Sequence, residues 1–316
     1  MRALVVSNMK PDAARPARGR FVRDQVAALR ALGNLEVELF EFPPGPRALG
    51  RAYSELRAAH RGGPCFDVVH AHFGLTAWPA LAVPARVRAL TMHGTDLADP
   101  RTRLATRAVL PRIDLPAAVS AELAARIPGR ARARAQVLPC GVDTGRFRPL
   151  PRAEARVELG LAEAGPLLLF PADPARPEKR HDRAAALARA AGAELLVLAD
   201  VEPERVPLHV NAANAVIVPS EREGFGLAAL EALACDVPVL ATPVGVHPEA
   251  LAGVAGTLCA PFDLDVWSAA LAPHLAAADP RVAGRAAAER YSARTMAERV
   301  RDAWARAAGG SRPVSG

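Results

Sequence analysis

The stretch Pro219-Ser-Glu-Arg-Glu223-Gly-Phe-Gly-Leu227-Ala-Ala-Leu-Glu231-Ala-Leu-Ala-Cys-Asp-Val-Pro-Val239 combines two glycines, a helical pattern and two glutamates. Leu227, Leu230 and Leu233 recur with the helical period, so a helix with one packed face is expected directly after the glycines. The N–H groups at a helix N-terminus favour phosphate oxygens, and glycines expose these groups. The stretch therefore predicts a phosphate-binding loop that leads into a helix.

Two carboxylates bracket this loop. Glu223 and Glu231 are separated by about 12 Å at the helical rise, which is near the reach from a sugar across a diphosphate to a ribose. Glu231 falls on the border of the packed helical face, where a carboxylate is costly unless it is hydrogen-bonded. Taken alone, the spacing is more typical of a solvated helix. A glycosidase pair is a further alternative, but the helical spacing is longer than a retaining hydrolase requires.

The wider sequence resembles the retaining glycosyltransferases of family 4, which have the GT-B fold. The donor signature of that family matches Ser-x-x-Glu-Gly-Phe-Gly-Leu at 220–227, Leu-Glu-Ala-Leu-Ala at 230–234 and Val-Pro-Val-Leu-Ala-Thr at 237–242. Further motifs in family order lie at 67–72, 93–96, 141–149 and 176–179. The resemblance implies an α/β protein with two facing Rossmann-like domains and a donor cleft between them.

Strand and helix patterns alternate along the chain, as in parallel sheets covered by helices. The expected strands are 3–6, 37–40, 68–72, 90–92, 116–119, 136–138, 167–170, 195–198, 215–218 and 239–241. Prolines at 149 and 151 mark the junction. We expect an N-terminal acceptor domain over 1–145, a C-terminal nucleotide-sugar domain over 146–291 and a disordered tail over 309–316. The last helix, 292–308, is expected to complete the first domain, as in GT-B proteins; its alternative is a packing helix of the second domain.

The resemblance assigns roles to residues of the donor motifs. Glu231 would bind the ribose and Glu223 the transferred sugar. Lys179 would bind the diphosphate, and it is one of only two lysines in the chain. Arg176 is its expected partner, although the family places the arginine where this chain has Pro174. The loop backbone would bind phosphates and sugar hydroxyls through Gly224, Phe225, Gly226 and Leu227.

The first half of the chain supplies two more candidates. His93 follows a strand and matches the family histidine that contacts the donor sugar. Gly19 lies in the first strand-to-helix loop, where the family usually has two glycines. A metal site of His93 with His70 and His72 is the alternative. The family instead uses Lys, Arg and helix dipoles, so we expect neither a metal nor a cofactor beside the donor. Lys179, Glu223 and His93 are the predicted catalytic residues.

Charge is unevenly distributed. Residues 1–150 contain 23 Lys and Arg against 12 Asp and Glu, whereas 151–316 contain 17 against 21. The excess predicts an anionic or lipid-linked acceptor, or contact with an anionic membrane. An ordinary arginine-rich surface, with a small sugar or natural product as acceptor, is the alternative. Aromatic residues are too scarce among the arginines for a nucleic-acid platform. No apolar run approaches a membrane span, so we expect a cytoplasmic protein, peripheral at most to the inner membrane face.

The predicted activity is sugar transfer from a nucleotide-sugar with retention of anomeric configuration, of the hexosyltransferase type (EC 2.4). A nucleotide-sugar epimerase or a phosphorylase of the same fold is one alternative. A non-catalytic basic protein that binds anionic polymers or membranes is another.

Overall fold

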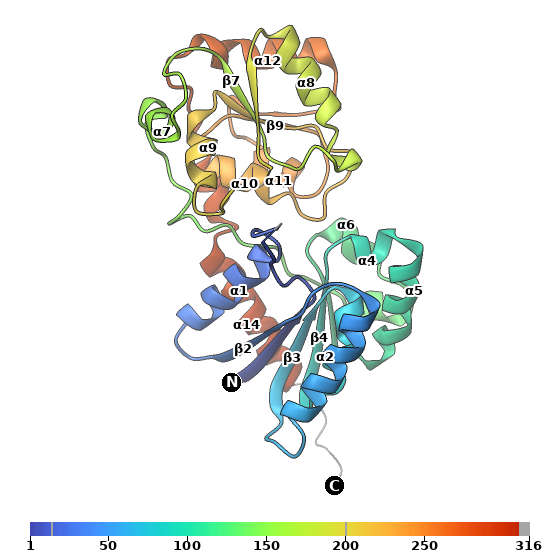
Figure 1. Cartoon of the computed structure of the whole chain (residues 1–316). Coiled ribbons are helices and arrows are strands. Elements are labelled where there is room, and N and C mark those ends of the chain that lie inside the picture. Colours follow the sequence, from blue (N-terminus) through green and yellow to red (C-terminus); the bar gives the residue numbers. More distant parts are fainter. Residues whose placement is uncertain (14, 200, 310–316) are drawn as a thin grey trace. The chain divides into compact units, whose positions relative to one another are not determined.

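The chain forms two compact units (Figure 1). The computed structural model describes residues 1–13, 15–199 and 201–309. Unit 1 comprises Met1–Gly141 together with the chain from Ala293 onward, and unit 2 comprises Val142–Ser292. Residues 310–316, within the tail predicted to be disordered, lie outside the described residues. In the part of the chain that is described, no helix is both long and apolar enough to cross a membrane.

Unit 1 contains a six-stranded parallel sheet in the order β2-β1-β3-β4-β5-β6. Its strands are β1 (Arg2–Ser7), β2 (Glu36–Glu41), β3 (Phe66–His72), β4 (Ala85–Met92), β5 (Leu115–Ala118) and β6 (Gln136–Val137). Its helices are α1 (Arg20–Ala31), α2 (Pro46–Ala59), α3 (Ala77–Ala80), α4 (Thr95–Ala98), α5 (Pro100–Val109), α6 (Ala121–Ala125) and α14 (Ala293–Gly309), with 3₁₀ turns η1 (Gly74–Thr76), η2 (Leu110–Arg112) and η3 (Gly129–Arg134).

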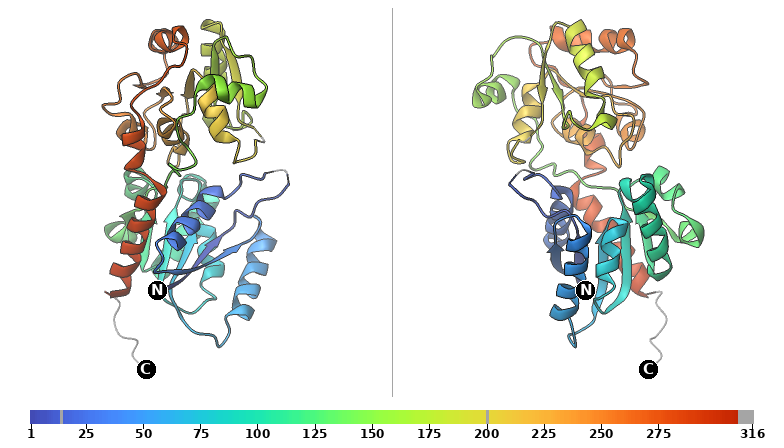
Figure 2. Two further views of the ribbon diagram at one scale, coloured as in Figure 1. Left: turned by 90° about the vertical axis from the view of Figure 1, so that its left-hand side faces the viewer. Right: turned by 45° about the vertical axis from the view of Figure 1, so that its right-hand side comes forward.

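Helices α1 and α14 pack together on one face of this sheet (Figure 1, Figure 2). Val22, Val26 and Leu29 of α1 are buried at the i, i+4, i+7 spacing of one helical face. Met296, Val300 and Trp304 of α14 join the same core. The last helix therefore contributes its apolar stripe to unit 1, although unit 2 separates the two segments in the sequence.

Unit 2 contains a five-stranded parallel sheet in the order β11-β10-β9-β7-β8. Its strands are β7 (Leu167–Phe170), β8 (Glu194–Val197), β9 (Ala215–Val218), β10 (Val239–Ala241) and β11 (Leu258–Cys259). Its helices are α7 (Arg152–Leu159), α8 (His181–Ala190), α9 (Val206–Ala212), α10 (Leu227–Ala234), α11 (His247–Leu251), α12 (Leu264–Ala276) and α13 (Arg285–Glu289), with the 3₁₀ turn η4 (Pro177–Lys179). Helices α8 and α12 lie side by side over one core that includes Phe170 and Trp267 (Figure 1).

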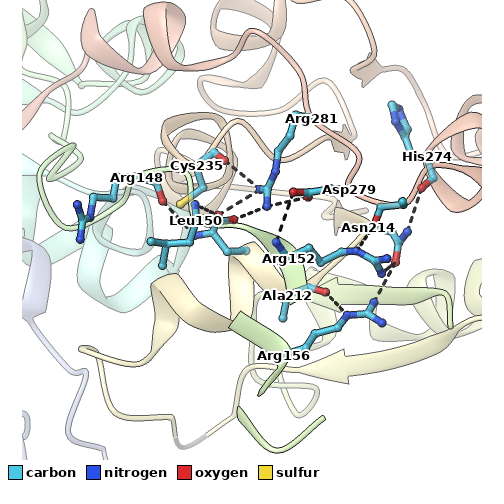
Figure 3. Close-up of polar contacts among 12 residues, drawn as sticks. Arg148, Leu150, Arg152, Arg156, Ala212, Asn214, Cys235, His274, Asp279 and Arg281 are labelled. Atoms are coloured by element: carbon cyan, nitrogen blue, oxygen red, sulfur yellow. Dashed lines mark hydrogen bonds and ion pairs between the residues drawn. The ribbon is translucent and has the colours of Figure 1, made fainter. Parts of the chain in front are cut away.

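A polar network fixes the end of unit 2 at which the strands begin (Figure 3). Asn214 directly precedes β9, and its Oδ1 accepts from the Leu167 amide at 3.0 Å and from Arg156 at 3.2 Å. Arg156 of α7 is 1% exposed, and its Nε donates to the Ala212 carbonyl at 2.9 Å. Its Nη1 donates to three backbone carbonyls, so each nitrogen of this buried charge has a hydrogen-bond partner. A ligand site is expected at the opposite end of the sheet, at the carboxyl ends of the strands.

Candidate active site

The predicted donor residues of unit 2 gather at the carboxyl ends of its strands. From β7 the chain passes to β8 on one side and later to β9 on the other, so the strand order reverses between β7 and β9. Ligands of open parallel sheets bind at such a reversal. Lys179 follows β7, and Glu223 follows β9. The two residues therefore flank the position where a ligand is expected.

Lys179 and Glu223 are in direct contact. Lys179 Nζ donates to Glu223 Oε1 at 2.7 Å and to Oε2 at 2.6 Å. The side chains are 15% and 8% exposed, so both charges are largely removed from water. Ser220 Oγ donates a further bond to Glu223 Oε1 at 2.7 Å. The Glu221 amide also binds the Glu178 carbonyl at 2.9 Å, which joins the two loops through their backbones.

The loop after β10 extends this network. Thr242 Oγ1 donates to the Ser220 carbonyl, and the Thr242 carbonyl accepts from Nδ1–H of His247 at 2.9 Å. His247 is fully buried, and burial lowers its pKa. Because Nδ1 donates, Nε2 of the neutral ring carries a lone pair, for which the described residues provide no partner.

Two glycines let these loops approach each other. Gly226 has φ +102°, and a Cβ at this position would lie 2.6 Å from His247 Nε2. Gly245 has φ +61°, and a Cβ there would collide with the Phe225 carbonyl oxygen. Val246 donates its amide to that same oxygen at 2.8 Å. Both positions therefore require glycine on conformational and on steric grounds.

The remaining donor candidates occupy different environments. Leu227 begins α10, while Glu231 lies in that helix, half-buried as its place on the border of the packed face predicts. Phe225 is buried against Tyr291, and Gly224 is half-buried in the loop between Glu223 and Phe225. Arg176 is half-exposed, and its Nη2 binds Glu178 Oε1 at 2.8 Å. The structure thus brings Lys179 and Glu223 together, whereas Arg176 is bonded to a near neighbour in its own loop.

Arg180, beside Lys179, has an unusual backbone. Its φ is +56° and its ψ is +53°, in the left-handed region that favours glycine. The Arg180 side chain is held by Asp182, at 2.8 and 2.6 Å, and by Glu221. These carboxylates raise the pKa of the guanidinium, so its charge is permanent.

The candidates of unit 1 lie where β1, β3 and β4 end. His93 follows β4, and its Nε2 is 2.9 Å from Nδ1 of His72, the last residue of β3. The His93 ring also packs on Phe21 and Phe73, with centroids 4.9 and 4.7 Å away. Its amide and that of Gly94 donate to the buried Asp96 carboxylate. The histidine is therefore fixed through both its ring and its backbone.

Gly19 adopts φ +70° at the start of α1, and a Cβ there would collide with the Met9 carbonyl oxygen. Met9 in turn lines a cavity of about 260 Å³. Its other lining residues are Asn8, Arg18, Pro44, Phe73, Leu75, Thr95, Asp96 and Thr102. Arg18 is the single cation that the described residues contribute to this lining, and it binds Asp12 at 2.7 Å. The cavity lies where the strand order reverses between β1 and β3.

Two family models match the chain. Glycosyltransferase Family 4 matches residues 4–146, and Glycosyl transferases group 1 matches residues 166–290. The D-inositol 3-phosphate glycosyltransferase of Actinosynnema mirum is 32% identical over 323 residues, covering 84% of this chain and 76% of that protein. The chain belongs to glycosyltransferase family 4. The enzyme of the same name from Mycolicibacterium paratuberculosis is also 32% identical to this glycosyltransferase, with 90% and 75% covered.

Solved structures agree with this glycosyltransferase in fold. Sucrose-phosphate synthase of Thermosynechococcus elongatus has a TM-score of 0.75 at 19% identity, covering 97% of this chain and 99% of that one. HepE of Anabaena, in complex with UDP and glucose, has a TM-score of 0.69 at 18% identity, covering 97% and 100%. The predicted GT-B class, with two parallel-sheet α/β domains, is confirmed.

Three contacts of this glycosyltransferase were missed by sequence reasoning. Ser220 belongs to the donor motif, but nothing in its type predicts a bond to Glu223. His247 follows β10, and nothing in the sequence around it predicts its bond to the Thr242 carbonyl. Gln25 is buried on the apolar face of α1, at 8% exposure, and its Nε2 lies 3.3 Å from His72 Nε2. A polar residue between Val22 and Val26 is the signal that would have identified it.

Proposed function

We propose that this glycosyltransferase transfers a sugar from a nucleoside-diphosphate sugar to a small acceptor with retention at the anomeric carbon, as an enzyme of the hexosyltransferase type. The observation that carries the proposal is the Lys179–Glu223 contact where the strand order of unit 2 reverses. An ammonium group has three N–H donors, and two of them face Glu223. The third is available to a phosphate oxygen.

The donor roles follow from this position. Lys179 and the first N–H groups of α10 neutralise the diphosphate, with Arg176 as a second cation once it leaves Glu178. Gly224, Phe225, Gly226 and Leu227 offer backbone N–H groups, while Glu231 binds the ribose. Glu223 binds hydroxyls of the transferred sugar, and His93 of unit 1 is a candidate ligand of a sugar hydroxyl. HepE has been solved with UDP-glucose and starch synthase IV of Arabidopsis thaliana with ADP, which supports this class of donor.

The reaction needs little covalent participation by the protein. The bond from the anomeric carbon to the β-phosphate oxygen breaks, and a bond to the acceptor oxygen forms on the same face of the sugar. The acceptor hydroxyl gives its proton to the departing diphosphate. Lys179 stabilises the charge that develops on that leaving group.

We place the acceptor in the cavity of unit 1 beside Gly19. Its walls are mainly apolar, through Met9, Pro44, Phe73 and Leu75, and its volume of about 260 Å³ suits one ring system. These features favour a small acceptor with an apolar part. Relatives that carry the name D-inositol 3-phosphate glycosyltransferase make an anionic polyol the second candidate, for which Arg18 would supply the cation.

The test is a panel of UDP-, GDP-, ADP- and dTDP-sugars, incubated with aglycones and with inositol phosphates. Release of nucleoside diphosphate should depend on the acceptor, and mass spectrometry should detect a product heavier than the acceptor by one glycosyl residue. Acceptor-independent conversion of the nucleotide-sugar would instead indicate an epimerase. We further propose that no divalent metal is required, so turnover should persist in EDTA; loss of turnover that Mg²⁺ or Mn²⁺ restores would contradict this.

A further inference from the structure

Gln25, His72 and His93 form a hydrogen-bonded row inside unit 1. Gln25 comes from the buried face of α1, His72 from the end of β3, and His93 from the residue after β4. The Gln25 amide nitrogen is 3.3 Å from His72 Nε2, and His72 Nδ1 is 2.9 Å from His93 Nε2. Gln25 is 8% exposed and His72 is fully buried. Water therefore does not compete for these contacts.

The direction of each bond follows from the chemistry of its donor. An amide nitrogen only donates, so Nε2 of His72 accepts and its ring proton is on Nδ1. That Nδ1–H then donates to Nε2 of His93. In a neutral ring the remaining proton of His93 is on Nδ1, which has no partner within the described part of the chain.

Neighbouring contacts leave this row undisturbed. His70 stacks on His72 with centroids 4.8 Å apart, but its own nitrogens are occupied. Trp304 Nε1 donates to His70 Nδ1 at 3.1 Å, and His70 Nε2 donates to Thr91 Oγ1 at 2.7 Å. Burial lowers the pKa of His72 to about 3 and also holds the pKa of His93 well below its ordinary value. All three rings are thus neutral at neutral pH, and each exists as one tautomer.

We infer that Gln25 and His72 are positioning residues that set the hydrogen-bond polarity of His93, so that His93 presents an N–H donor at Nδ1 to its ligand. Such a donor suits a hydroxyl oxygen and discriminates against a group that can only donate. The identity of the ligand, a sugar hydroxyl, rests on the proposed function. The tautomer itself does not.

The first experiment reads the tautomer directly. Long-range proton–nitrogen NMR spectra of histidine-labelled protein, with His93 assigned through His93→Gln, should show Nδ1 protonated and Nε2 unprotonated. His72→Asn retains an N–H donor near the place of Nδ1, so His93 should keep this state. His72→Asp puts a carboxylate oxygen there, so Nε2 of His93 should become protonated. Equal Nε2 states in the Asn and Asp variants, or a protonated Nε2 in the wild type, would overturn the inference.

A second variant tests the start of the row. Gln25→Met removes the amide donor at similar volume, so both His93 tautomers should appear in a protein whose thermal unfolding confirms that it is folded. An unchanged single tautomer would remove Gln25 from the assignment.

Turnover supplies the functional readout. One lost hydrogen bond corresponds to about a tenfold fall in kcat/KM for the nucleotide-sugar, which we expect for His72→Asp. His72→Asn should remain within about twofold of the wild type, because its donor is preserved. Equal kcat/KM in the two variants would contradict the role of the tautomer in turnover. The NMR experiment contains no nucleotide-sugar. Absence of transfer by the wild type would therefore count against the proposed function, while the spectra would still decide the tautomer.

Discussion

Lys179 Nζ lies 2.7 and 2.6 Å from the two carboxylate oxygens of Glu223, in a pair whose side chains are mostly buried. The carboxylate thereby holds the ammonium, which comes from the segment after β7, against the loop that joins β9 to α10. Through this contact each residue stabilises the fold, in addition to its proposed role in binding the donor. Variants at the two positions should therefore have separable effects on stability and on donor binding.

Removal of either charge should destabilise unit 2, because the remaining charge is left buried without its partner. We expect Glu223→Gln and Lys179→Met each to lower the free energy of unfolding by about 2 kcal/mol in urea titrations. Glu221→Gln is the matched control: its carboxylate lies in the same loop but is half-exposed, so its loss should cost less than about 1 kcal/mol.

Donor binding should separate the same two variants. Lys179→Met should lower the affinity for UDP by about tenfold or more. Glu223→Gln frees the ammonium, so the affinity for UDP should stay the same or increase. Turnover should fall in both. Titration calorimetry with UDP measures this affinity. An unchanged affinity in Lys179→Met would show that this lysine does not bind the phosphates.

The left-handed backbone of Arg180 gives a second prediction. A side chain in this region costs about 1 kcal/mol relative to glycine. Arg180→Ala keeps that strain and loses the bonds to Asp182 and Glu221, whereas Arg180→Gly loses both the strain and the bonds. The glycine variant should therefore be about 1 kcal/mol more stable than the alanine variant in chemical denaturation. Equal stabilities would mean that the loop absorbs the conformation without strain.

Much of the fold could be predicted because apolar runs mark buried parallel strands. Strands β7, β9 and β10 begin and end at the predicted residues. Strand β4 begins at Ala85, five residues before its predicted start, since Arg86 and Arg88 interrupt the apolar run while lying in the ladder. Strand β11 was not predicted, because two residues carry no periodicity.

For the site, the sequence predicted individual residues that lie in motifs but not the contacts between them. Lys179 and Glu223 were found as separate candidates, but their mutual bond depends on the order β9-β7 in the sheet, which no local pattern encodes. His70 and His72 are two residues apart on β3, so they share one face of the strand, and their rings stack. Their hydrogen bonds to Trp304 and Gln25 join elements that are distant in sequence.

The buried histidines should make unit 1 sensitive to acid. Burial lowers the pKa values of His70, His72 and His93, whose positive charges also disfavour one another. Below about pH 6.5 the unfolded chain therefore binds protons that the folded state does not bind. The free energy of unfolding is highest above this pH and decreases as the pH falls. For His72, with a folded pKa of about 3, the loss between pH 7 and pH 5 is about 2 kcal/mol.

The measurement for this prediction is the free energy of unfolding across that pH range, with His72→Asn as the control that lacks one titrating ring. Asp96, the acidic group next to His93, has a pKa raised by burial, so its contribution changes in the opposite direction. A wild type and a His72→Asn variant with parallel pH profiles would show that His72 is not the titrating group.

The basic first half of the chain gives the last prediction. Helix α5 exposes Leu104 at 70%, flanked by the exposed residues Arg101, Arg103 and Arg107, for which no ion pair occurs among the described residues. An exposed leucine among exposed arginines fits an anionic bilayer surface, where the apolar side chain inserts and the guanidinium groups meet phosphates. We therefore expect the protein to float with anionic liposomes at low salt but not with neutral ones.

Two variants of equal charge test whether α5 is responsible. Changing Arg101, Arg103 and Arg107 to Gln should abolish flotation, whereas changing Arg47, Arg57 and Arg61 to Gln should not, because those exposed arginines lie in and after α2 and not on the helix that carries Leu104. Raising the salt past about 0.1 M should weaken flotation and raise the Michaelis constant of a membrane-held acceptor. Donor affinity, set by short contacts such as those of Lys179, should change less. If flotation is absent and acceptor kinetics do not respond to salt, the arginines are ordinary surface, and the small acceptor proposed for the cavity beside Gly19 is not held at a membrane.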